Sequence, residues 1–106
     1  MSKRGGVGNI MLQAKKMQGQ IKQLQDKLDE VKFEGASGGG LVTVTVNGRQ
    51  EVEKLGIHPD AINPDDLAEL ADLLTAALNM ALSESRDSSQ SEMKKITGGV
   101  NLPGLF

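Results

Sequence analysis

One apolar stripe in the N-terminal third of the chain constrains the fold more than any other feature. Its residues recur in alternating steps of four and three, at Ile10, Ala14, Met17, Ile21, Leu24, Leu28 and Val31. Such a heptad pattern is typical of a helix that packs lengthwise on another helix. We therefore predict a helix from about Asn9 to Val31. Its dimer or core seam consists of Ile10, Met17, Ile21, Leu24 and Leu28.

A helix of this length spans about 35 Å, which is more than three short strands can cover. Part of the seam should therefore contact a second helix or a second subunit. The alternative is an ordinary amphipathic helix that packs on its own sheet. Gly19 lies on the outer side of the helix and costs roughly 1 kcal/mol relative to alanine. The sequence alone gives no reason for this glycine.

The stretch GASGGGLVTVTVNG, from Gly35 to Gly48, contains a strand and two turns. Its first and last glycines before the strand, Gly35 and Gly40, have P-loop spacing. However, a P-loop has Lys and then Ser or Thr where this chain has Leu41 and Val42. The alternating, β-branched run LVTVTV instead predicts a strand. Asn-Gly at its end fits a type I′ turn.

Neighbouring segments complete an α+β fold. The stretches VKFEG and RQEVEKLGI predict two further strands, and with LVTVTV they form a three-stranded antiparallel meander. A second helix follows, with Asn63 as its N-cap, Pro64 at its first position and Gly98-Gly99 at its end. Its wide apolar face indicates packing on a sheet. The segment SESRDSSQS is compatible with an exposed continuation of this helix. The predicted order is α-β-β-β-α, with two long helices.

Length and composition restrict the class of protein. We expect a single domain over residues 1–106, with a flexible basic arm at 1–8 and a C-terminal tail at 98–106. The chain has no Cys, so disulfides and thiol chemistry are excluded. No apolar run is long enough for a signal peptide or a membrane span, so we expect a cytoplasmic protein without membrane contact.

The charges are distributed unevenly along the chain. Residues 1–32 carry seven Lys or Arg and three acids, whereas the remainder carries five and eleven. No acid occurs before Asp26. This asymmetry suggests an anionic partner for the N-terminal segment, although solvation alone would also explain it. Lys15, Lys16 and Lys22 lie off the seam, so we expect them to be exposed.

Enzymatic chemistry has little support in the sequence. His58 is the only histidine, and it has no nucleophile or metal partner nearby in the chain. The acids between Asp60 and Asp72 do not have the spacing of an EF-hand, and helix capping explains them. We therefore expect no catalytic residue, no metal, no cofactor and no small-molecule substrate. With only two Phe as aromatic residues, stacking on single-stranded nucleic acid is also disfavoured.

With this architecture, the chain resembles the YbaB/EbfC family of bacterial nucleoid-associated proteins. The matching stretches are GNIMLQAKKMQ, GASGGGLVTVTVNG, LGIHPDAI and LPG, and they follow the family's order over nearly the whole length. His58 departs from the family, which usually has an acid before this proline. The resemblance implies a tweezer-like homodimer with helices that project from a central pair of sheets. It also implies binding to double-stranded DNA on the nucleoid.

The family's DNA contacts are attributed to the projecting helices. Carried onto this chain, the resemblance points to Lys15, Lys16 and Lys22, and further to Lys94 and Lys95 of the last helix. Charge and flexibility add Lys3 and Arg4 to the nucleic-acid-binding candidates. Such groups neutralise phosphates without reading bases, which fits a role in nucleoid organisation or gene regulation. The main alternative is a protein-interaction module with weak or incidental DNA binding, and a third is a small-ligand enzyme.

Overall fold

The computed structural model describes the backbone of residues 2–98 and the side chains of residues 8–98. Its elements are α1 (Ser2–Leu28), β1 (Lys32–Ser37), the 3-10 turn η1 (Gly38–Gly40), β2 (Val42–Asn47), β3 (Val52–Ile57), the 3-10 turn η2 (Pro59–Ala61) and α2 (Leu67–Thr97). The strands form one antiparallel sheet in the order β1-β2-β3. The predicted α-β-β-β-α order and the three-stranded antiparallel sheet are thereby confirmed.

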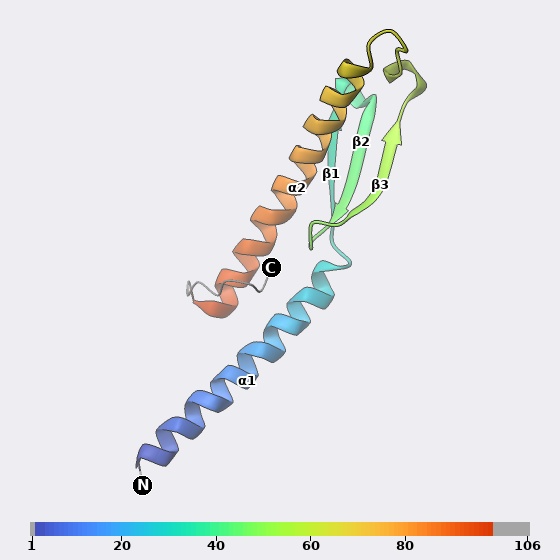
Figure 1. Cartoon of the computed structure of the whole chain (residues 1–106). Helices are drawn as coiled ribbons and strands as arrows, with labels where there is room; N and C mark the ends of the chain where they lie inside the picture. Colours follow the sequence, from blue (N-terminus) through green and yellow to red (C-terminus); the bar gives the residue numbers. More distant parts are fainter. Residues whose placement is uncertain (1, 99–106) are drawn as a thin grey trace.

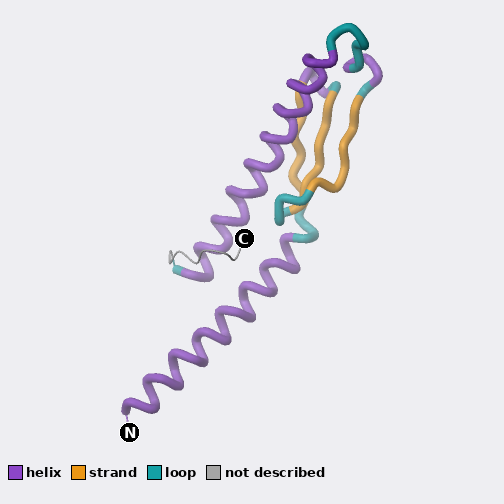
Figure 2. The backbone as a smooth tube through the Cα atoms, in the orientation of Figure 1, coloured by secondary structure: helices purple, strands orange, loops and turns teal. Residues whose placement is uncertain are grey.

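The molecule is elongated, with principal extents of 76 × 21 × 16 Å. Helix α2 lies along the sheet, whereas α1 leaves one end of the sheet and extends away from it (Figures 1 and 2). Helix α1 begins at Ser2 rather than near Asn9, and it ends at Leu28 rather than at Val31. The backbone of residues 2–8, for which the sequence predicted a flexible arm, is thus helical. The predicted tail lies outside the described residues from residue 99 onward.

The core lies between α2 and the central strand. The alternation of β2 directs Val42, Val44 and Val46 toward α2, and all three are buried. Ala77 and Ala81 are the fully buried residues of α2 in the same cluster. Half-buried side chains surround this cluster, namely Phe33, Leu41, Leu70, Leu73, Leu74, Leu78 and Leu82. The core is therefore aliphatic apart from one phenylalanine at its edge.

Gly35 explains how closely α2 approaches the sheet. A Cβ atom at this position would lie 2.1 Å from the Ala77 carbonyl oxygen and 2.9 Å from the Ala81 nitrogen. Only glycine leaves room for the helix backbone at this point of β1. The glycines of η1 have a different role, because Gly38, Gly39 and Gly40 all have positive φ and turn the chain into β2. The glycine-rich stretch therefore serves packing and turning, and it opens into a strand rather than a helix.

The turn between β2 and β3 differs from the predicted type I′ turn. The Asn47 carbonyl accepts from the Gln50 N–H, and Gln50, not Gly48, has a positive φ of 60°. This is the arrangement of a longer hairpin loop, in which a turn precedes a left-handed residue. Packing accounts for Gly48, because a Cβ there would lie 2.8 Å from the Leu28 carbonyl oxygen.

The start of α2 also differs from the prediction. The N-cap is Asp66, whose carboxylate accepts a hydrogen bond of 3.2 Å from the Glu69 N–H. Asn63, the predicted cap, instead accepts from the Asp65 N–H, 3.0 Å away, in a local turn around Pro64. At the other end, Gly98 is left-handed and its N–H bonds the Lys94 carbonyl. The predicted end of the helix at Gly98 is confirmed.

The serine-rich segment of α2 is less exposed than predicted. Ser85 and Ser89 are buried, at one-turn intervals after Ala77 and Ala81. The Ser85 hydroxyl donates to the Asn47 carbonyl at 2.6 Å. The Gln50 side-chain amide donates to the Ser89 hydroxyl at 3.2 Å. These bonds fasten the β2–β3 turn to α2, so serines can occupy buried positions without unsatisfied polar groups.

Candidate functional site

The outer surface of α1 carries three lysines that no acid neutralises. Lys15, Lys16 and Lys22 are exposed, as predicted from their positions off the seam. Among residues 8–98, the ion pairs made by Lys and Arg side chains are Lys32–Glu53, Arg49–Asp29 and Lys95–Glu92. Lys15, Lys16 and Lys22 take part in none of them. Their side chains are therefore exposed and unpaired, and the first acid of the chain is Asp26, four residues after Lys22.

The seam of α1 divides into a buried half and an open half. Ile21, Leu24 and Leu28 are buried, Met17 is half-buried and Ile10 is 67% exposed. Helix α1 packs against α2 along the buried half. Part of the seam thus contacts a second helix of the same chain. The alternative, an amphipathic helix packed on its own sheet, does not describe α1, which packs on α2. A role of the open half in a dimer stays a prediction.

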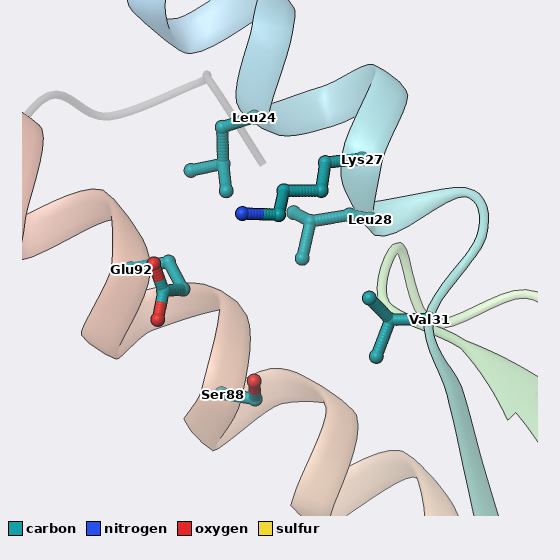
Figure 3. A pocket seen from close by; sticks show the side chains of 6 residues that line it. All are labelled: Leu24, Lys27, Leu28, Val31, Ser88 and Glu92. Carbon is teal, nitrogen blue, oxygen red and sulfur yellow. The ribbon is translucent and has the colours of Figure 1, made fainter.

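A small notch separates the end of α1 from α2. Its volume is about 140 Å³, and its lining consists of Leu24, Lys27, Leu28, Val31, Ser88 and Glu92. In Figure 3, Lys27 and Glu92 extend into the notch from opposite helices. Sequence patterns did not indicate this notch. None of the predicted basic residues lines it, so the candidate interface is the convex surface of a helix rather than a pocket.

The remaining basic candidates differ in their surroundings. Lys3 and Arg4 lie in the first turns of α1, and their side chains are outside the described residues. Lys94 is exposed in the last turn of α2. Lys95 donates to Glu92 Oε1 at 3.0 Å, which partly neutralises its charge. Both lysines also suit the C-terminal end of a helix dipole, so α1 offers the clearer set of unpaired cations.

Two exposed apolar surfaces were missed at the sequence level. On α1, Met11 and Leu12 are 59% and 66% exposed. On β3, Val52, Leu55 and Ile57 are 50%, 49% and 37% exposed. The β3 residues pair with Val46, Val44 and Val42, so they share the face that α2 covers on β2. The sequence alone does not reveal this exposure, because it depends on how β3 pairs with β2 and on where α2 lies.

His58 and its neighbouring acids have local structural partners. The His58 Nδ1 atom accepts a hydrogen bond from the Asp60 N–H at 3.1 Å, which caps η2. Across the described part of the chain, no three His, Asp or Glu side chains gather closely enough to hold a metal ion. The described helices include none that is long and apolar enough to cross a membrane.

Comparison with known proteins gives one consistent family. Residues 3–100 match the YbaB/EbfC DNA-binding family. A nucleoid-associated protein of Clostridium novyi is 46% identical over 100 residues, which are 94% of this chain and 88% of that protein. One from Caldanaerobacter subterraneus is 45% identical, over 94% of this chain and 90% of its own length. The crystal structure of an uncharacterized protein from Helicobacter pylori has a TM-score of 0.65 and 26% identity, covering 74% of this chain and 90% of that chain.

Proposed function

Because the chain belongs to the YbaB/EbfC DNA-binding family, we propose that it binds double-stranded DNA as a homodimer on the bacterial nucleoid. Binding is mainly to phosphates and serves nucleoid organisation or gene regulation. The names of its relatives place them on the nucleoid, and we extend that location to this protein. The proposal includes no catalytic step and no cofactor.

The observation that carries the proposal is the set of unpaired lysines on α1. Lys15, Lys16 and Lys22 are exposed and have no carboxylate partner among the described residues. An unpaired ammonium group can contact a phosphate without first breaking an ion pair within the protein. Each such contact also releases a counterion from DNA, which favours binding. Such contacts fix the protein on the duplex without selecting a sequence. The projecting shape of α1 makes these lysines accessible to a long polymer (Figure 1).

The exposed face of β3 supports the homodimer. Val52, Leu55 and Ile57 continue the buried apolar face of β2 beyond the edge that α2 covers. A single chain leaves this row in water, which is costly for an apolar strand at a sheet edge. A second copy that covers β3 with its own β3 buries both rows at once. Each dimer then presents two α1 helices to DNA.

The test of DNA binding replaces Lys15, Lys16 and Lys22 together by Glu. These residues lie off the buried half of the seam, so the fold should remain intact. A mobility-shift titration with random-sequence duplex should show binding by the native protein and none by the triple variant. Arg86→Glu is the control, because Arg86 is exposed on α2 and its guanidinium donates to the Ser83 hydroxyl; this change should leave most of the binding. Equal binding by the native protein and the triple variant would contradict the assignment of α1.

A protein-interaction module is the second candidate function. The apolar row of β3 favours it, because the same surface would suit a protein partner other than a second copy. In that case, duplex binding is weak and does not depend on the charge of α1. The triple variant would then retain whatever weak binding the native protein has.

A further inference from the structure

Three consecutive apolar residues surround the projecting part of α1. Ile10, Met11 and Leu12 are 67%, 59% and 66% exposed. Successive helical residues point about 100° apart, so three of them occupy more than half of the helix circumference. Only Ile10 belongs to the seam. A partner helix packed along the seam would leave Met11 and Leu12 in water, so a different surface is needed to cover them.

Each of the two off-seam residues has a lysine one helical turn away. Lys15 follows Met11 by four residues, and Lys16 follows Leu12 by four residues. Side chains of a helix lean toward its N-terminus, so each lysine stem is placed to cover its apolar neighbour. Lys15 and Lys16 themselves point about 100° apart. No acid occurs among the first 25 residues, so the complementary surface is strongly anionic.

The surface that fits is a groove with two anionic walls and an apolar floor. The major groove of B-DNA is about 12 Å wide and admits an α-helix. Its walls carry phosphates, and its floor carries the C5-methyl groups of thymine as its apolar feature. Viewed down the helix axis, Gly19 points between Lys15 and Lys16. A Cβ at Gly19 would meet nothing within 4 Å. Its missing side chain reduces the bulk of α1 on the side that would enter the groove.

We propose that α1 lies in the major groove, with Leu12 against thymine methyl groups, with Lys15 and Lys16 on phosphates of opposite walls, and with Met11 beside the wall that Lys15 contacts. The inference rests on the proposed DNA binding. It adds a preference for A·T-rich duplex that phosphate contacts alone do not supply.

The experiment compares two duplexes of the same A·T-rich sequence, one with thymine and one with uracil, which lacks only the C5-methyl group. The native protein should bind the thymine duplex more tightly, by roughly fourfold for each methyl group that it covers. The double variant Met11→Gln, Leu12→Gln should bind both duplexes equally and should keep the salt dependence of the native protein, because its lysines remain. Met80→Gln, at a 49% exposed methionine of α2, is the matched control and should keep the thymine preference.

The outcomes separate this inference from the proposed function. Equal native affinity for the two duplexes would overturn the inference while leaving DNA binding in place. No binding to either duplex would instead contradict the proposed function itself. Sedimentation of the double variant gives the third outcome: a lower mass than that of the native protein, with the thymine preference retained, would show that Met11 and Leu12 contact a second copy, which overturns the inference.

Discussion

Gly35 and Gly19 are the same residue type in opposite surroundings. Gly35 lies where the backbone of α2 approaches β1, and a Cβ there would overlap the Ala77 carbonyl oxygen. Gly19 lies in the middle of α1, and a Cβ there would meet nothing within 4 Å. The first glycine is required by packing within the chain. The second has no such reason, and in a helix interior it only lowers the stability of the isolated chain.

Replacing each glycine by Ala should therefore change stability in opposite directions. Gly35→Ala should lower the free energy of unfolding by about 1–3 kcal/mol or more, because an added methyl group forces the helix and strand apart. Gly19→Ala should raise it by up to about 1 kcal/mol through helix propensity. Urea unfolding followed by circular dichroism, at one protein concentration, measures both. A Gly35→Ala protein as stable as the native one would contradict the close approach of α2 to β1.

Sequence patterns predicted the elements whose signals are local. The heptad steps of α1 and the alternation of LVTVTV depend on few neighbours, and both elements are present. The details that failed depend on distant contacts. Gly48 packs against Leu28 instead of forming a type I′ turn. Ser85 and Ser89 are buried because Asn47 and Gln50 supply their hydrogen-bond partners from the hairpin loop.

Helix α1 is attached to the sheet and α2 through the buried half of its seam. Leu28 is 2% exposed and packs against Gly48, whereas Ile10, Met11 and Leu12 in the N-terminal half of α1 are 67%, 59% and 66% exposed. Leu28→Ala should lower the free energy of unfolding by about 2–5 kcal/mol, the usual cost of such a cavity. Leu12→Ala, at an exposed leucine of the same helix, should change it by less than about 0.5 kcal/mol. Similar losses for the two variants in thermal unfolding would contradict the division of the seam.

The protein consists of a body, formed by the sheet and α2, and a projecting basic helix, α1. The exposure of Lys15, Lys16 and Lys22 was predictable, because their positions off the seam are visible in the sequence; their contact with DNA stays a prediction. The exposed row of β3 was not predictable in the same way. Its apolar residues resemble those of any half-buried strand, and only the placement of α2 over β1 and β2 leaves them uncovered.

The proposed dimer interface on β3 is tested by Leu55→Asp. Leu55 is about half exposed in the single chain, so the charge should cost the fold little. Within a dimer it would be buried without a partner, at a cost of several kcal/mol. Sedimentation at micromolar concentration should give a dimer for the native protein and a monomer for this variant. Lys54→Asp alters the neighbouring residue on the opposite face and should remain dimeric. A native monomer would contradict the homodimer, and a dimeric Leu55→Asp protein would place its interface elsewhere.

The salt dependence of binding shows whether unpaired cations of α1 hold duplex DNA by its phosphates. If each subunit of a dimer supplies two or three contacts from Lys3, Arg4, Lys15, Lys16 and Lys22, the logarithm of the binding constant should fall with the logarithm of salt concentration with a slope of about −4 to −5. Affinity should lie near the micromolar range of non-specific binding. Titration of random-sequence duplex by fluorescence anisotropy over a salt series gives this slope. A slope near zero for the native protein would contradict the phosphate account and favour the protein-interaction module.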